Sequence, residues 1–390
     1  MADLSTAKIT REGAVERGTH EKQARAWRRW TTYCGSIGLE HNLFLDEFTR
    51  HQRIKIFGAF AVALREGRFS KRANGTMASK SVKSSIDLVA ATFRENGYGN
   101  PTRDEDLDTA FLLQRQYRAL AKGDAKEKQQ KALPVDVIRT VAHNQTTETT
   151  QATAQLIIGA FFFACRSCEY LKVSRPGQTK QLRIRNLQFA RNGTVIPNTS
   201  PNLNEADCVS ITFEMQKNDM KHETVTQWAT NDLVMCPVRA WAAIVSRILK
   251  YKGATEETHV SAVWRKKKIE YIDATTVISA LQVAVKAYGE SALGIEAHEI
   301  GTHSLRSGAA MAMYLGGCPV YSIMLIGRWR STAFLQYIRK QIAEFTFDVS
   351  QKMLAVPIFR HVLPPTKAEQ PAATSMQNIV GRVSSLMLAC

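Results

Sequence analysis

The chain has 390 residues, of which 44% are apolar, and this is enough for two domains with separate hydrophobic cores. Its net charge of +17 favours a polyanionic partner, and the even spread of Lys and Arg favours nucleic acid over a membrane patch. The sequence has no apolar run of about eighteen residues and no secretory signal, so we expect no membrane span. Its odd number of cysteines, seven, suits free thiols in a reducing compartment.

The N-terminal part predicts a small all-helical domain over residues 21–125, after a flexible start at residues 1–20. Ala24, Trp27, Trp30 and Tyr33 recur every three residues, which favours a packed core stripe over base stacking. No strand alternation interrupts this part. The expected helices begin at Glu21 and then cover residues 42–53, 54–65, 79–96 and 107–120.

Basic residues flank these helices and are expected to be solvated or to contact backbone phosphates. A second basic run, WRKKK at residues 264–268, is expected to be exposed and to face phosphates in the same way. The candidate DNA-binding residues are Arg25, Arg28, Arg29, Lys71, Arg72, Lys80, Lys83, Lys266 and Lys267.

A charged segment with few apolar residues, 126–133, predicts a linker, and Pro134 can open the next helix. The second predicted domain covers residues 134–356. Within it, an apolar helix at 152–164 leads to Arg166, a lone cation three residues before Glu169. This pair fits a structural ion pair on a helix, but a buried guanidinium is also suited to hold an anion.

Cysteines at positions 165 and 168 form a C-x-x-C, but no second pair of Cys or His stands near enough to complete a zinc site. We therefore expect Cys165 and Cys168 to be packing residues, and no metal.

Short alternating runs between residues 181 and 229 predict a small antiparallel sheet, with a hairpin turn at Asn192-Gly193. Lys217 lies in a tight segment between two of these strands, and Lys221 follows it closely. A further long helix is expected from residue 236. The predicted fold class is therefore mainly α, with a small antiparallel β-sheet in the second domain.

An imidazole and a guanidinium, His303 and Arg306, lie three residues apart and so on one face of an expected helix. Thr302 is the expected N-cap, and together these donors suit an anionic oxygen such as phosphate. The helix is expected to end at Gly316, and a second apolar helix and a Gly-Arg-Trp turn follow. Tyr337 is flanked by cations, which favour its phenolate form.

This ordered set of residues resembles the tyrosine recombinase, or phage integrase, family. The resemblance rests on Arg-x-x-Glu, a lysine in a β-hairpin, His-x-x-Arg, a Gly-x-Trp turn and a Tyr eight or nine residues later. The segment IGRWRSTAFLQYIR looks most like the Crypton and DIRS branch of eukaryotic mobile elements. The resemblance implies a helical core-binding domain that clamps DNA, a mixed α+β catalytic domain, and a C-terminal tail at 357–390 that either packs on a neighbouring protomer or is detached.

The family resemblance also implies the chemistry. Tyr337 would attack a DNA phosphorus and form a 3′-phosphotyrosine, while Arg166 and Arg306 would stabilise the phosphoryl oxygens. Lys217, or in second place Lys221, would protonate the leaving 5′-oxygen, and His303 would assist the tyrosine. The position of the family's second histidine is filled here by Trp329 or Arg328, with Trp329 the preferred alignment. The implied catalytic set is Tyr337, Arg166, Lys217, His303, Arg306 and Trp329.

The predicted function is therefore site-specific DNA recombination or integration without ATP, metal or cofactor. The expected partners are double-stranded DNA and further copies of the chain, from dimer to tetramer, inside the cell and in the nucleus of a eukaryote. Two alternatives stay open: a DNA-binding protein derived from such an element that no longer cleaves, and a type IB topoisomerase. The target sequence, the direction of recombination and the host are not encoded in any recognisable pattern.

Overall fold

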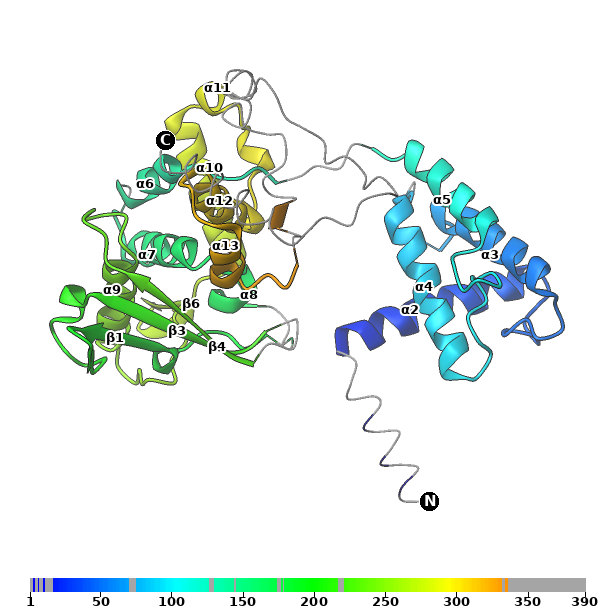
Figure 1. Cartoon of the computed structure of the whole chain (residues 1–390), viewed down its shortest axis with the longest axis horizontal. Coiled ribbons are helices and arrows are strands. Elements are labelled where there is room, and N and C mark those ends of the chain that lie inside the picture. The colour runs from blue at the N-terminus through cyan, green and yellow to red at the C-terminus, as the bar shows by residue number, and fades with distance from the viewer. Residues whose placement is uncertain are drawn as a thin grey trace, which may run out of the picture. The chain divides into compact units, whose positions relative to one another are not determined.

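The computed structural model describes residues 3, 6, 10, 17–69, 75–125, 130–143, 145–173, 177, 179–216, 221–331, 334 and 335. Over these residues the chain is mainly helical with a small antiparallel sheet, which confirms the predicted fold class (Figure 1). The buried side chains form two separate hydrophobic cores, one within the helical bundle α2–α5 and one within a mixed region of helices and strands, α6–α13. No helix in the described ranges is long and apolar enough to span a membrane.

The helical bundle is built around an aromatic core. Its helices are α2 (Arg17–Ser36), α3 (Arg50–Arg65), α4 (Ser79–Glu95) and α5 (Phe111–Lys122). Trp30 is fully buried, stacks on Phe57 with ring centroids 4.6 Å apart, and donates from Nε1 to the Leu43 carbonyl at 2.8 Å. The predicted core stripe is confirmed for Trp30 and Tyr33, which are both buried.

The other two members of the predicted stripe are less buried. Trp27 is partly buried and packs on this core beside Phe44 and Phe93, whereas Ala24 is exposed and Ala26 is buried instead. A strict three-residue spacing falls short of the 3.6 residues of a helical turn, so Ala24, at the far end of the stripe from Tyr33, is rotated away from the core face.

The expected helix over residues 42–53 is wrong. Residues 37–49 form turns, with Leu45 in the left-handed region at φ 54°, and the helix starts only at Arg50. Thr49 and Gln52 make a capping box that fixes this start, because each side chain bonds the other residue's backbone N–H. Residues 50–65 therefore form one helix where two were expected.

Two other helix starts differ from the prediction. The helix expected from Glu21 begins at Arg17, and α5 begins at Phe111 where a start at residue 107 was expected. Leu107 has a positive φ of 63°, which an α-helix does not allow.

The described residues of the mixed region form eight α-helices. They are α6 (Val135–His143), α7 (Glu148–Phe162), α8 (Ser167–Tyr170), α9 (Pro237–Ile248), α10 (Ala274–Tyr288), α11 (Glu290–Leu293), α12 (Thr302–Leu315) and α13 (Val320–Gly327). Three 3₁₀ turns join them, at Ile184–Asn186, Leu203–Glu205 and Ala297–Glu299.

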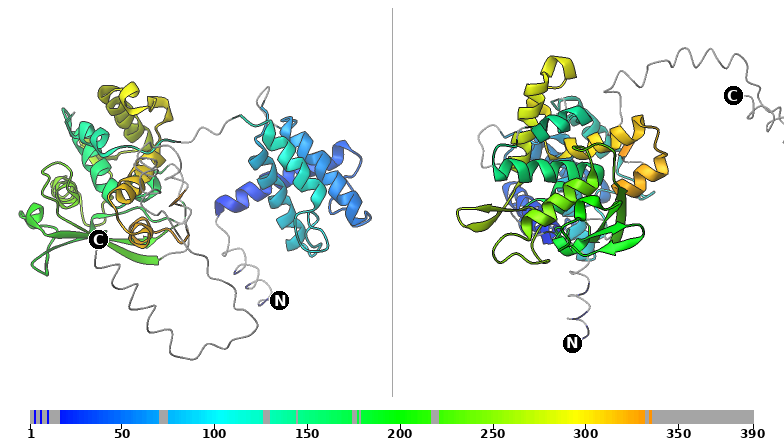
Figure 2. Two further views of the ribbon diagram at one scale, coloured as in Figure 1. Left: turned by 45° about the horizontal axis from the view of Figure 1, so that its top comes forward. Right: turned by 90° about the vertical axis from the view of Figure 1, so that its left-hand side faces the viewer.

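A four-stranded antiparallel sheet in the order β2-β1-β3-β4 lies beside these helices. Its strands are β1 (Leu187–Arg191), β2 (Thr194–Ile196), β3 (Cys208–Met215) and β4 (Lys221–Trp228). Alternate residues of β3 are buried, and α9 packs against β3 and β4, so helices cover one face of the sheet (Figure 2).

Two hairpin turns have non-Gly residues with positive φ. Asn192 and Gly193 have φ of 49° and 75°, which confirms the predicted turn. The basic run at 264–268 forms a second, unpredicted hairpin between β5 (Ala262–Arg265) and β6 (Lys268–Tyr271), with Lys266 and Lys267 at its tip.

Helix α7 is the centre of the mixed region and contacts α6, α9, α10 and α12. Its Gly159 lies against Trp241, so closely that an added Cβ would come within 2.8 Å of the indole. On α12, an added Cβ at Gly308 would come within 2.4 Å of the Leu133 carbonyl oxygen. Helix α12 also packs on α7, and Arg306 of α12 donates to the carbonyl of Ala164 just after α7, where the candidate site lies.

A buried arginine cluster as candidate active site

Arg166 lies in the sharp turn that follows α7. Ala164 takes a positive φ of 44° there, and Arg166 becomes the N-cap of the short helix α8. Its guanidinium donates from Nη1 to Glu169 Oε1 at 2.9 Å and to Gln216 Oε1 at 3.0 Å. The structural ion pair considered from the sequence is therefore present, and the Arg166 side chain remains 18% exposed.

Arg306 lies in the second turn of α12 and is 2% exposed. Its guanidinium donates to the backbone carbonyls of Ala164 and Gly327, and its Cζ lies 4.3 Å from the centroid of the Trp329 ring. Burial, and to a lesser extent the positive charges of Arg166 and Arg328, lower the pKa of Arg306 to about 9, against the opposing effect of Glu169.

The N-cap of α12 is Gly301, so the expectation of Thr302 as N-cap is wrong. The Gly301 N–H donates to Ser304 Oγ at 3.1 Å, and Thr302 is the first helical residue. His303 is exposed on the first turn of the same helix, and its backbone N–H donates to Gln130 Oε1 at 2.8 Å. His303 lies within one helical turn of Arg306, but its side chain is exposed whereas Arg306 is buried.

Arg328 is the third guanidinium of the cluster, and its side chain is fully buried. It is the left-handed C-cap of α13, with φ 55°. Its Nη2 donates to Glu169 Oε2 at 2.8 Å, and its Nε donates to Gln216 Oε1 at 3.1 Å. The sequence analysis considered Arg328 only as an alternative to Trp329, because nothing in its neighbourhood signals a partner 159 residues earlier in the chain.

Trp329 packs over Arg306 and Gly327. An added Cβ at Gly327 would lie only 1.7 Å from Cζ3 of the indole, so the ring occupies the space that any side chain at this position would need. The Trp329 ring also lies 5.6 Å from the ring of Phe334. The Gly-x-Trp pattern therefore has a steric reason, because the missing side chain lets the indole cover the Arg306 guanidinium.

The cluster carries more positive than negative charge. Within the described ranges, the charged side chains classed as buried are Glu169, Arg306 and Arg328, and Arg166 adjoins them. Three guanidiniums and one carboxylate leave two positive charges in excess. Burying such charge is unfavourable unless an anion compensates it, so the arrangement suits a bound anion with several oxygens.

Two predicted catalytic residues, Tyr337 and Lys217, lie outside the described residues. Lys221, the second candidate for the hairpin lysine, is exposed at the first position of β4, opposite Met215. The described part of the site thus brings together Arg166, Arg306 and Trp329.

Except for Arg29, the predicted DNA-binding residues are exposed where they are described, while Lys71 and Arg72 fall outside the described residues. Arg25, Arg28 and Lys80 are exposed, and Lys83 is ion-paired with Asp87 at 3.0 Å.

Arg29, in the same group, is partly buried. Burial and the neighbouring charge of Arg25 lower its pKa. Lys266 and Lys267 are exposed at the tip of the β5–β6 hairpin.

The two cysteines beside Arg166 are packed among other side chains. Cys165 is buried, and burial raises the pKa of its thiol to about 12, while Cys168 is partly buried with its thiol pKa raised for the same reason. In the part of the chain that the structure describes, no three His, Cys, Asp or Glu side chains gather as a metal site.

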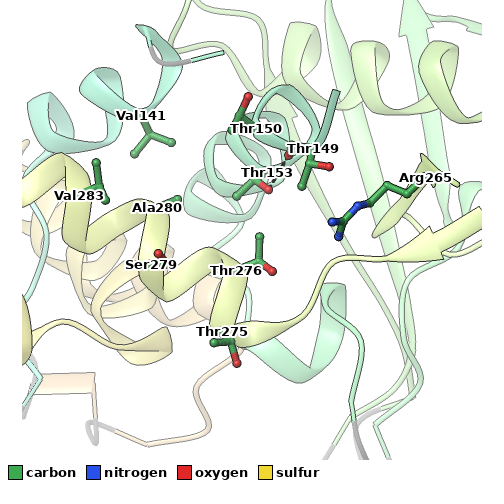
Figure 3. A pocket seen from close by; sticks show the side chains of 10 residues that line it. All are labelled: Val141, Thr149, Thr150, Thr153, Arg265, Thr275, Thr276, Ser279, Ala280 and Val283. Carbon is green, nitrogen blue, oxygen red and sulfur yellow. Dashed lines mark hydrogen bonds between the residues drawn. The ribbon is translucent and has the colours of Figure 1, made fainter. Parts of the chain in front are cut away.

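A cavity of about 520 Å³ lies between α7 and α10, away from the arginine cluster (Figure 3). Arg265 points into it, but the hydroxyls of Thr153 and Thr276 bond to the Thr149 carbonyl and to Asp273. The cavity lies at the N-terminal end of α7, a helix about 22 Å long, and Arg166 follows the C-terminal end of that helix.

No protein-family model matches the sequence, and no curated protein matches it. The solved structures to which the chain is similar include an integrase and two recombinases, all at low sequence identity. The Tn1549 transposon integrase in complex with circular intermediate DNA is 11% identical, with a TM-score of 0.47 over 85% of this chain and 99% of that chain. The XerH site-specific recombinase bound to difH substrate is 13% identical, with a TM-score of 0.41 over 75% and 69%. The XerA recombinase is 12% identical, with a TM-score of 0.34 over 87% and 100%.

Proposed function

We propose that this chain is a tyrosine recombinase, which breaks and rejoins specific sites in double-stranded DNA. The observation that carries the proposal is the pair of guanidiniums, Arg166 and Arg306, in a buried cluster with two positive charges in excess. This is the electrostatic environment that a phosphodiester needs when negative charge builds up on its oxygens. The indole on Arg306 keeps water from that guanidinium and so strengthens its field.

The reaction follows from the residue types. The phenolic oxygen of Tyr337 attacks the phosphorus, a P–O bond to tyrosine forms, and the P–O5′ bond breaks. His303 takes the phenolic proton, and Lys217 gives a proton to the leaving 5′-oxygen. Arg166 and Arg306 hold the two non-bridging oxygens, the place that metal ions take in other nucleases.

Rejoining reverses these steps with a different strand. A 5′-hydroxyl from a partner duplex attacks the phosphotyrosine, the new phosphodiester forms, and Tyr337 recovers its proton. The ester conserves the energy of the broken bond, so neither ATP nor a metal ion is consumed. Trp329 supports Arg306 in this scheme, because an indole donates a hydrogen bond but cannot carry a proton.

The roles of the other parts of the chain are inferred from its sequence. The bundle at 21–125 clamps DNA, the segment 126–133 links it to a catalytic domain at 134–356, and the tail at 357–390 serves contacts between protomers. The chain acts as a dimer to tetramer on DNA, within the compartment that holds the DNA, which is the nucleus in a eukaryote. Its motif around Tyr337 supports an origin in a Crypton-type or DIRS-type mobile element.

A covalent-trapping experiment tests the proposal. A binding site is first selected from a library of random duplexes with the full-length chain, and a substrate nicked beside the selected site then prevents rejoining. The native chain should form an adduct with DNA that survives denaturing electrophoresis. Tyr337→Phe should form none, while Tyr321→Phe, which changes an exposed tyrosine of α13, should behave as the native chain does.

The same substrate separates the alternatives. A protein that only binds DNA would give no adduct, whether the native chain or Tyr321→Phe is tested. This outcome would refute the enzymatic proposal. A type IB topoisomerase would give the adduct and relax supercoiled DNA without exchanging strands between two duplexes. Exchange of labelled ends between two duplexes identifies a recombinase.

A further inference from the structure

Arg328 binds four parts of the fold at once. Besides Glu169 and Gln216, its Nη1 donates to the carbonyls of Phe163 at 3.0 Å and Ile326 at 2.9 Å. Its Cζ also lies 3.8 Å from the centroid of the Phe213 ring. These acceptors belong to the end of α7, to α8, to the end of β3 and to α13 itself. The Arg328 guanidinium is therefore committed to protein acceptors and is not free to reach a ligand.

Arg328 and Arg166 share the same two acceptors. Glu169 Oε1 accepts from Arg166, and Glu169 Oε2 accepts from Arg328. Gln216 Oε1 accepts from both guanidiniums. The orientation of the Gln216 amide follows from this, because the opposite orientation would set its NH₂ group against two cations. Its Nε2 has no hydrogen-bond partner among the described residues.

The shared carboxylate decides how much charge Arg166 keeps. If Glu169 paired with Arg166 alone, the two charges would cancel, and the partly exposed guanidinium would attract an anion weakly. The second oxygen of Glu169 faces Arg328, which is fully buried and has no anion other than Glu169 among its described partners. Arg328 thus compensates the carboxylate and leaves a net positive charge at Arg166.

We propose that Arg328 is a positioning residue of the phosphate site, which neutralises Glu169 and anchors Gln216 so that Arg166 keeps its charge for a phosphate oxygen. This inference rests on the proposed function and adds to it. The residue at or beside the family's second-histidine position acts here through Glu169 and makes no contact with the phosphate itself.

Three variants separate this electrostatic role from a purely structural one. Arg328→Gln lowers the excess charge of the cluster from two to one. Glu169→Gln combined with Arg328→Gln restores an excess of two positive charges, although the ion pair between Arg328 and Glu169 is gone. Arg328→Lys keeps the charge but loses the fork of donors that bridges Glu169 and Gln216.

The primary measurement is the affinity of the full-length chain for inorganic phosphate, followed by titration calorimetry. Arg328→Gln should weaken binding about tenfold, because one of two excess charges is removed in a partly desolvated site. The double variant and Arg328→Lys should each bind within about threefold of the native chain. Thermal melting is recorded for each variant. A loss of stability shared by all three variants could not explain a difference in phosphate affinity between them.

Two results would overturn the inference. One is an Arg328→Gln variant that binds phosphate with native affinity. The other is a double variant that binds phosphate no better than Arg328→Gln alone, because charge compensation predicts that its affinity recovers. Should Arg328→Gln not fold, Arg328→Lys decides the matter, and a tenfold loss of phosphate affinity in that variant counts against the inference.

Failure of the inference differs from failure of the proposed function. If the native chain forms the DNA adduct and Arg328→Gln forms it at the same rate, the recombinase stands and the role of Arg328 falls. If phosphate binding follows the expected order but no adduct forms on nicked DNA, the role of Arg328 stands and the recombinase falls.

Discussion

The aromatic centre of the bundle and the arginine cluster of the mixed region bury opposite kinds of side chain. Around Trp30 the bundle buries aromatic rings, and its described buried polar residues are the uncharged Ser85 and Thr102. Around Arg306 the mixed region gathers three guanidiniums, two of them buried, against one buried carboxylate, beside a hydrophobic core of its own. Burying aromatic area stabilises a fold, whereas burying like charges opposes it. The comparison indicates that the aromatic centre stabilises the bundle, whereas the arginine cluster lowers stability unless an anion compensates its charge.

The largest expected effect is a loss of stability in the aromatic core. Trp30→Ala should lower the free energy of unfolding by about 3–5 kcal/mol, because it removes a fully buried indole and leaves a cavity. Denaturant unfolding measures this change. Trp27→Ala is the matched control on the same helix and should cost clearly less, since Trp27 is only partly buried. Equal losses for the two variants would contradict the assignment of Trp30 as the centre of this core.

Arg306→Met should show the reverse pattern. Adduct formation with nicked DNA should slow by about 100- to 1,000-fold, because a donor to the phosphoryl oxygens is lost. The melting temperature should fall far less than in Trp30→Ala, because the lost hydrogen bonds to the Ala164 and Gly327 carbonyls are offset by the removal of repulsion from Arg166 and Arg328. A variant that instead melts as early as Trp30→Ala would place Arg306 among the residues that support the fold.

Gly327→Ala should lower adduct formation about tenfold. The new methyl group would lie in the space of the Trp329 ring and push the indole off the Arg306 guanidinium, which removes about 1–2 kcal/mol of cation–π attraction. Indole fluorescence should report the displaced ring. Gly35→Ala, near the end of α2 with no atom within 4 Å of the added Cβ and no positive φ, is a control for a change of glycine alone. The idea fails if Gly327→Ala retains both native activity and native fluorescence.

The smallest effect concerns pH. Below about pH 9 Arg306 is charged in the free protein, so phosphate affinity should not depend on this group. Above that value phosphate must bind together with a proton, so affinity should fall about fourfold between pH 8 and pH 9.5. Arg166→Met should move the decline to higher pH, because the charge of Arg166 is one cause of the lowered pKa. A decline that stays at the same pH in this variant would exclude Arg306 as its source.

Local patterns determined most of the secondary structure. Apolar periodicity located α4, Asn192-Gly193 located a hairpin, and Gly316 marked the end of α12. A continuous apolar run located α7, although the helix covers Glu148–Phe162 and not 152–164, and α9 begins at Pro237, one residue after the expected start. These signals act over a few residues, so they survive in any tertiary context. The missed turn at 37–49 shows the limit. Its apolar residues pack on the bundle core from turns as well as they would from a helix, and only the capping box at Thr49 marks the true helix start.

The sequence by itself identified Arg166, His303 and Arg306 as candidates for an anion site, because their types and spacing suit phosphate. Only the tertiary structure decided that Arg166 and Arg328 share Glu169 and Gln216, and that Trp329 covers Arg306. Arg328 reaches Glu169 across 159 residues and Gln216 across 112. Contacts over such distances depend on how α7, β3, α12 and α13 pack together, and no local periodicity encodes that packing.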